Sequence, residues 1–236
     1  MLFLIGALGI IFAGTFWFGY RQYLRLEHLN RKNLALSLIA AMALLTLLTL
    51  AHWIGLFPQE VAAPVTMGLY ALAAGFFFGN GTKLIVQKRR AGMVEYMHRS
   101  FWIDIAPNLI SALLVAYGIY RTGILTMGPF SGIGIASGLS LIGFGFFGWT
   151  VRIVPEFRNK GILILDQCID WKNVLSYEWH TEGVLLIDYM AGSQKICEFS
   201  TAIPVEDQLR VERLLGRRIK EHEDERKNVL AQEEVE

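Results

Sequence analysis

The sequence predicts a membrane α-helical protein with five spans that ends in a small α+β domain, an antiparallel sheet capped by one C-terminal helix. Composition supports this, because 53% of the 236 residues are hydrophobic and only 18% are charged, against about 25% charged in a typical soluble domain. The pattern of hydrophobic residues also changes along the chain. Long uncharged runs stop near residue 151, and short segments of alternating hydrophobic and polar residues follow. These features argue against a water-soluble enzyme, a disordered chain and a disulfide-stapled secreted module.

The charge of the chain is divided unevenly along its length. The formal net charge is +1, from 22 basic and 21 acidic side chains. Residues 1–150 hold 10 basic and 4 acidic side chains, a net charge of +6, whereas residues 151–236 hold 12 and 17, a net charge of −5. The near-neutral total therefore hides a basic membrane part and an acidic soluble part.

Five segments are apolar enough to cross a bilayer, whose hydrocarbon core of roughly 30 Å takes about 20 helical residues to span. The fourth is the most polar, because Asp104, Pro107 and Asn108 interrupt its beginning. Every amide in lipid needs an internal hydrogen-bond partner, so these segments are expected to be helices. The predicted spans are residues 2–20, 34–57, 65–86, 101–120 and 131–151, within a transmembrane domain of residues 1–152.

Basic residues in the short loops predict the orientation of the spans. The second loop, Pro58 to Pro64, has none, and the fourth has only Arg121. Because basic loops favour the cytoplasmic side, we expect the N-terminus outside and the C-terminal domain in the cytoplasm. The first span lacks a basic leader, which favours an uncleaved anchor over a signal peptide. The first and third loops hold Arg21, Arg25, Arg31, Lys32, Lys88, Arg89, Arg90 and Arg99.

Small residues recur at helical spacing in two of the spans. Ala71, Gly75 and Gly79 lie on one face of the third span, and Gly134 and Gly138 lie on one face of the fifth. Such spacing lets helix backbones approach closely. We expect these positions to pack helices within the chain, and the alternative is a dimer face or a site for a partner subunit.

Polar side chains at membrane depth are functional candidates by default. Asp104 is the first candidate, about one turn into the fourth span and close to Asn108. Asn80 and Lys83 lie at a similar depth at the end of the third span. The plain interpretation is an ion pair of Asp104 with Lys83 or Arg99, and the alternatives are a proton or substrate site or a side chain that reaches the interface.

No motif for catalysis or for a cofactor is visible in the sequence. Phosphate-binding loops, dinucleotide glycine motifs and nucleophile elbows are absent. His52 is the only histidine expected inside a span, and ligation of haem by two histidines needs a second. Cys168 and Cys197 predict free thiols rather than a metal site. We therefore expect a non-enzymatic protein with no cofactor, no metal and no nucleic-acid partner.

From Pro155 onward the spacing of hydrophobic residues becomes that of short strands separated by turns. Gly161 to Leu165 and Val184 to Met190 are predicted strands, and Gln194 to Phe199 follows a turn as another. Pro204 then opens an amphipathic helix with acids in its first turn. The predicted bounds are residues 155–220 for this domain and residues 221–236 for a charged tail.

A basic segment lies near the end of the predicted C-terminal helix. It is followed at once by acids from Glu221 onward, so we expect a solvated helix face with intrahelical ion pairs. The alternatives are contact with anionic lipid headgroups, or docking of the acidic domain on the basic inner loops. The basic candidates are Arg213, Arg217, Arg218 and Lys220.

The strand pattern of the domain resembles a known family. The run Gly161-Ile-Leu-Ile-Leu, the motif from Trp171 to Val174, and Tyr177-Glu178-Trp179 are similar to a bacterial pleckstrin-homology-like domain. More narrowly, they resemble uncharacterised bacterial multi-span membrane proteins that end in such a domain. Val174 stands where that pattern has Ile, which keeps an apolar side chain. The resemblance implies a fold and a place at the bacterial inner membrane, but no activity.

The function expected from these observations is that of a non-enzymatic interaction module or accessory subunit of a larger inner-membrane complex. Its expected partners are the lipid bilayer and either other membrane-protein subunits or further copies of the chain. One alternative is a small transporter or channel component that uses Asp104 and Asn108. A second alternative is a pigment- or haem-associated subunit.

Overall fold

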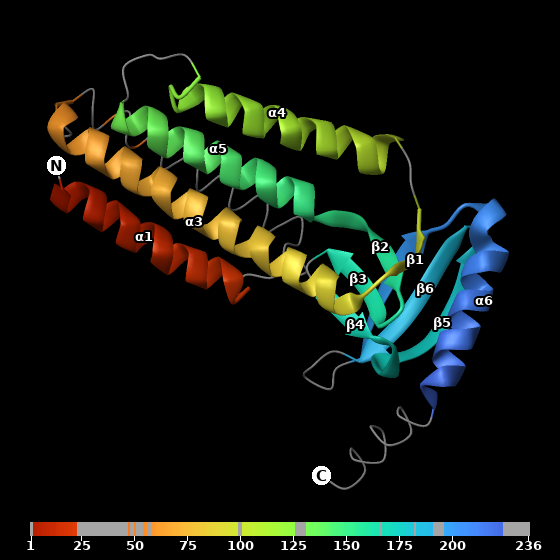
Figure 1. The fold of residues 1–236 in the computed structure, drawn as a ribbon. Helices are drawn as coiled ribbons and strands as arrows, with labels where there is room; N and C mark the ends of the chain where they lie inside the picture. Colours follow the sequence, from red (N-terminus) through yellow and green to blue (C-terminus); the bar gives the residue numbers. More distant parts are fainter. Residues whose placement is uncertain are drawn as a thin grey trace, which may run out of the picture. The chain divides into compact units, whose positions relative to one another are not determined.

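The structure is a computed structural model of the chain, shown in Figure 1. The chain divides into two compact units, one of Met1–Val86 with Phe101–Val151 and one of Gln87–Ser100 with Arg152–Glu236. The structure describes residues 2–22, 47, 50, 54–55, 58–98, 101–125, 131–165, 167–181, 183–190 and 196–223.

The described part of the first unit consists of helices that lie side by side in the order α1, α3, α5 and α4 (Figure 1). Three of the described helices, α1, α3 and α5, are long and apolar enough to cross a membrane. Most of the predicted span 34–57 lies outside the described residues. The helices are α1 (Leu2–Tyr20), α3 (Gln59–Ala91), α4 (Ala106–Arg121) and α5 (Gly132–Thr150), with a π-helical turn, η2 (Phe101–Ile105), before α4.

Helix α3 is longer than the predicted span 65–86. The sequence suggested a loop from Pro58 to Pro64, but α3 already begins at Gln59. The carbonyl oxygen of Pro58 accepts hydrogen bonds from the amides of Val61 and Ala62, at 2.9 and 3.0 Å. Pro64 lies inside α3 and has no N–H to donate to the carbonyl four residues earlier, yet the helix continues through it.

The predicted span 101–120 is helical but not uniformly so. Its first five residues form the π-helical turn η2, and the α-helix α4 that follows has 16 residues. Pro107 has no N–H group, so the carbonyl one turn earlier loses its α-helical partner and the turn can widen. As an α-helix alone, α4 is shorter than the roughly 20 residues that a span takes.

The second unit is antiparallel and ends in one C-terminal helix, as the sequence predicted, but its strands form two sheets rather than one. The first sheet has the order β1-β2-β3-β4 and the second the order β5-β6-β7. A 3₁₀ turn, η3 (Trp171–Asn173), joins the two sheets. The elements are β1 (Val94–Met97), β2 (Arg152–Arg158), β3 (Gly161–Leu165), β4 (Gln167–Asp170), β5 (Val174–Thr181), β6 (Val184–Met190), β7 (Ile196–Ala202) and α6 (Val205–Glu221).

One hydrophobic core holds this unit together. Alternation along β6 turns Leu185, Ile187 and Tyr189 inward and leaves the residues between them facing outward. Trp171 is 1% exposed, and its indole Nε1–H donates a hydrogen bond of 2.9 Å to the Arg158 carbonyl. Helix α6 closes the core with Val211, Leu214 and Leu215, which all lie on one helix face.

The second unit is larger than the predicted domain of residues 155–220. It includes Gln87–Ser100, which the sequence assigned to the third loop, and its second strand begins at Arg152. Strand β1 within this segment pairs with β2 across the register Tyr96↔Phe157 and Met97↔Glu156. Strand pairing thus joins this part of the third loop to the sheet, and the alternative of ion-pair docking on the basic inner loops stays a prediction.

Candidate interaction site on the C-terminal domain

Helix α6 carries the candidate site, and its sequence explains why it is amphipathic. Glu206 and Asp207 lie in its first turn and Arg218 and Lys220 in its last, which complements the helix dipole. The buried stripe of Val211, Leu214 and Leu215 fixes which face points inward. The opposite face therefore presents the charged side chains of α6 to solvent.

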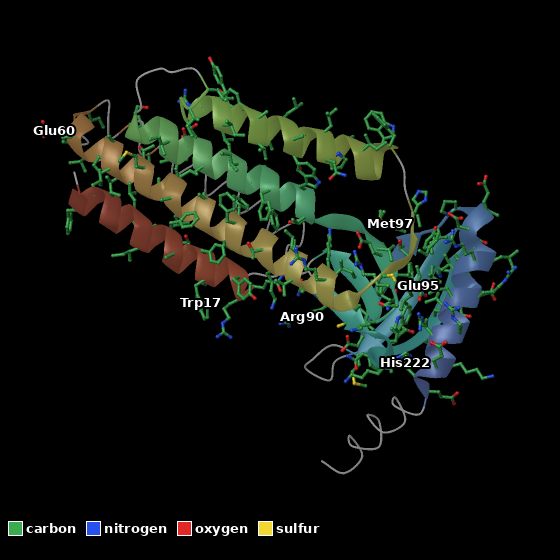
Figure 2. The ribbon with its side chains drawn as sticks, viewed as in Figure 1. Trp17, Glu60, Arg90, Glu95, Met97 and His222 are labelled. Carbon is green, nitrogen blue, oxygen red and sulfur yellow. The ribbon has the colours of Figure 1, made fainter. Side chains whose placement is uncertain are left out.

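A groove of about 710 Å³ lies along α6 and strand β1. Three arginines, Arg210, Arg213 and Arg217, follow one another along one face of the helix; we call them the arginine stripe. Glu95 of β1, labelled in Figure 2, lines the same groove. The groove is lined by Glu95, Glu206, Leu209, Arg210, Arg213, Leu214 and Arg217.

Glu95 is the centre of an ion-pair network in this groove. Arg218 donates to both of its carboxylate oxygens, and the bond from Nε to Oε2 measures 3.3 Å. Arg217 reaches the same carboxylate from Nη2, at 3.3 Å. Arg218 also binds Glu221, at 2.7 Å. The hydrogen bond to Glu95, more than any other contact, raises the pKa of the Arg218 guanidinium.

Tyr96, the next residue of β1, makes a second connection to α6. Its hydroxyl donates a hydrogen bond of 3.0 Å to Asp207 Oδ2. Arg210 lies with its Cζ 5.8 Å from the centre of the Tyr96 ring and donates to the Glu95 carbonyl at 3.2 Å. Burial, and after it the hydrogen bond to Asp207, raises the pKa of Tyr96. Both polar residues of β1 thus bind α6.

The arginine stripe keeps positive charge that these contacts do not neutralise. Within the described parts of the chain, neither Arg210 nor Arg213 makes an ion pair. The Arg217 side chain is 59% exposed and shares Glu95 with Arg218. Leu209, in the same groove, is 64% exposed. The groove therefore offers exposed guanidinium groups next to an apolar side chain.

The predicted basic residues of α6 divide into two groups. Arg217 and Arg218 make the expected intrahelical contacts with Glu221, but they also bind Glu95. Arg213 and Lys220 are exposed. Sequence reasoning missed Glu95 because it lies in a basic segment far along the chain from α6, with no local pattern that points to a partner.

A second charged cluster holds the end of α3 to the first sheet. Arg158 donates from Nη1 to the carbonyl oxygens of Lys88 and Gly92, at 2.9 and 2.6 Å. Its Nε also donates to Glu156, at 2.8 Å, and Glu156 is only 3% exposed. Arg158 therefore caps carbonyl groups at the C-terminus of the helix, where a cation is favourable.

The polar candidates of the first unit are only partly described. Asn80 is buried, and its amide donates to the Phe76 carbonyl of its own helix at 3.1 Å. Lys83 Nζ lies 5.4 Å from the centre of the Tyr20 ring of α1. Asp104 lies in η2, but its side chain is outside the described residues, as are Arg99 and His52.

Asn108 is half-buried on α4. The proposed partnership of Asp104 with Asn108, Lys83 or Arg99 therefore stays a prediction.

Four of the five predicted packing residues contact neighbouring helices within the first unit. A Cβ atom added at Gly75 or Gly79 would overlap backbone carbonyl groups of α1, and one added at Gly138 would lie 2.6 Å from the Gly118 carbonyl of α4. A Cβ at Gly134 would lie 3.1 Å from the Arg121 carbonyl, and Ala71 is half-buried. These glycines thus pack helices of the same chain closely, in accord with the first interpretation.

The remaining reactive side chains of the domain are dispersed. Cys168 and Cys197 are free, and burial raises the pKa of the Cys168 thiol. Among the described residues, no group of three or more His, Cys, Asp or Glu side chains is placed to hold a metal ion.

Comparison with known proteins adds one observation. Residues 154–220 match the family model of a domain of unknown function (DUF5673). The match runs from within β2 to the last turn of α6, and β1 precedes it. The chain matches no curated protein and no solved structure. The groove thus combines a helix of the matched segment with a strand from outside it.

Proposed function

We propose that this chain is a non-enzymatic integral membrane protein whose C-terminal domain is an interaction module of a larger complex. The observation that carries the proposal is the arginine stripe beside the exposed Leu209. Arginine is enriched in protein interfaces, and the buried centre of an interface is more apolar than the rest of the surface. The partner is either another membrane-protein subunit or a second copy of the chain.

In this proposal the protein crosses a bacterial inner membrane five times, with its N-terminus outside and its C-terminal domain in the cytoplasm. Lys88, Arg89 and Arg90 in the last turn of α3 support this orientation, because basic residues flank spans on the cytoplasmic side. The pleckstrin-homology-like fold is part of the same proposal. It is supported by the motif from Trp171 to Val174 and by an order of two antiparallel sheets followed by one helix.

The chemistry of the groove suits recognition of a carboxylate-bearing surface. Guanidinium groups can form two parallel hydrogen bonds with one carboxylate, which gives geometric specificity as well as affinity. Arg213 and Arg217 are one helical turn apart and both exposed. Two carboxylates of a partner can therefore be held side by side, while Leu209 packs against an apolar group.

A photoreactive side chain tests the proposal in the intact membrane. We would place p-benzoylphenylalanine at Leu209 and, as a matched control, at Lys172, an exposed position on η3. Irradiation is expected to give a covalent adduct from position 209 only, and mass spectrometry would identify the attached chain. Absence of any adduct from position 209, with both variants folded, would contradict an interaction module centred on α6.

A small transporter or channel component is the second candidate function. The observation that favours it is the π-helical turn at Asp104 just before Asn108, since such turns are frequent at functional sites. Its test is Asp104→Asn, with Asn108→Ala as the second variant. Unchanged transport phenotypes with intact assembly in both variants would exclude this candidate, whereas loss of transport with normal assembly would favour it.

A further inference from the structure

The outer face of the second sheet is acidic. Glu178 on β5, Asp188 on β6 and Glu198 on β7 alternate with inward-facing residues such as Tyr177 and Ile187. Glu178 and Glu198 are exposed, and Asp188 is half-buried. Three neighbouring strands thus present a carboxylate on the same side.

Two of these acids are directly opposed. The register of β6 and β7 pairs Asp188 with Glu198, and like charges in this position repel each other. Ser176 donates a hydrogen bond of 2.6 Å to Asp188 Oδ2. Within the described residues, no basic side chain forms an ion pair with Asp188 or Glu198. A cation from another molecule would relieve this repulsion.

The arginine stripe of α6 has the complementary chemistry. We infer that the arginine stripe of one copy docks on the acidic outer face of the second sheet of another copy. This inference rests on the proposed function, because it names a second copy of the chain as the partner of the interaction module. Arg213 and Arg217 face Asp188 and Glu198 in this arrangement.

The spacing of the two surfaces supports the pairing. Side chains one turn apart on a helix have Cβ atoms about 5–6 Å apart. Directly opposed residues of an antiparallel sheet have Cβ atoms about 4.5–5.5 Å apart. Arg213 and Arg217 can therefore each meet one carboxylate of the Asp188–Glu198 pair.

Each surface also carries an exposed apolar side chain next to its charges. Leu209 is one turn before Arg213 and is 64% exposed. Ile196 is two residues before Glu198, on the same face of β7, and is also 64% exposed. Contact between copies would bury both, and burial of apolar area is the main favourable contribution to association.

A reciprocal charge exchange tests this inference on the full chain. Two copies with different affinity tags are produced together, extracted in mild detergent, and recovered through one tag while the other is quantified. The variants are Arg213→Glu, Glu198→Arg and, as a control with the same change of charge, Lys172→Glu on the exposed η3 turn. Circular dichroism confirms that each variant is folded.

The expected result is specific to the pair of residues. Arg213→Glu in both copies, or Glu198→Arg in both, lowers recovery of the second tag about five- to tenfold, as expected for an interfacial charge reversal. One copy with Arg213→Glu and the other with Glu198→Arg restores recovery to within about twofold of the wild type, because every contact again joins opposite charges. Lys172→Glu has no effect.

Three results would overturn the inference. They are absence of recovery between wild-type copies, failure of the mixed pair to restore it, and an equal loss for Lys172→Glu. If copies do not associate, the photo-crosslinking experiment at position 209 shows whether the proposed function is rejected as well. An adduct with a different protein, without association between copies, rejects the second copy as partner and keeps the interaction module.

Discussion

The carboxylate of Glu95 on strand β1 binds the guanidinium of Arg218 on helix α6, although the two residues are 123 positions apart in the sequence. Strand β1 begins three residues after helix α3 ends at Ala91. The ion pair, with the hydrogen bond from Tyr96 to Asp207, therefore fastens the segment that follows α3 to the helix that lines the candidate site.

Glu95→Gln is expected to loosen this connection. It keeps the size of the side chain but removes the charge that binds Arg218 and Arg217, and hydrogen bonds to charged groups contribute about 1.5–3 kcal/mol. We predict faster amide hydrogen exchange across Val94–Met97, measured by mass spectrometry on the full chain. Glu212→Gln, an exposed position on α6, is the control. Equal exchange in the two variants would contradict the prediction.

Arg158→Met is expected to destabilise the second unit strongly. It removes the cap on the Lys88 and Gly92 carbonyls and leaves the buried Glu156 carboxylate without this cation, at a cost of about 3–5 kcal/mol. Chemical unfolding followed by Trp fluorescence would measure the loss. Adding Glu156→Leu should recover part of it, because the buried charge is then removed as well. A double variant less stable than Arg158→Met would refute this explanation.

Gly79→Ala is expected to disturb the packing of α3 against α1. The added methyl group would overlap the Phe16 carbonyl, and overpacking costs about 1–3 kcal/mol. Gly9→Ala on α1 is the matched control, since a Cβ there has no neighbour within 4 Å. Thermal unfolding in mild detergent should separate the two variants. Similar melting temperatures would mean that the close approach at Gly79 does not contribute to stability.

Tyr96→Phe is expected to change how stability depends on alkaline pH. Because the pKa of Tyr96 is higher in the folded than in the unfolded chain, its contribution is present below pH of about 10, the unfolded value, and is lost as the pH rises further. The variant should lose about 0.5–1.5 kcal/mol at neutral pH, because the bond to Asp207 is gone. Its stability should then fall less than that of the wild type between pH 9 and 11. Parallel curves would contradict the assignment.

Elements with a strong local pattern could be predicted from the sequence. The uncharged run from Leu2 to Tyr20 and the apolar strands Gly161–Leu165 and Val184–Met190 have the predicted bounds. In each case the hydrophobic pattern of neighbouring residues decides the element. The start of α6 was equally clear, because Pro204 and the acids after it are typical of a helix N-terminus.

Elements that depend on distant partners could not be predicted in the same way. Strand β1 has only four residues in a basic segment, and it forms because β2 supplies its hydrogen bonds. Only part of the candidate site could be predicted from the sequence, for the same reason. Arg217 and Arg218 are recognisable in the helix sequence, whereas their acidic partner Glu95 is identified only once β1 is paired with the sheet.

Native mass spectrometry of the full chain, released from mild detergent, tests most directly whether this protein acts by association. We expect species heavier than the single 26.6 kDa chain, either multiples of that mass or complexes with another subunit, and fewer of them for Arg213→Glu than for Lys172→Glu. A single species at 26.6 kDa, the same for the wild type and both variants, would contradict it.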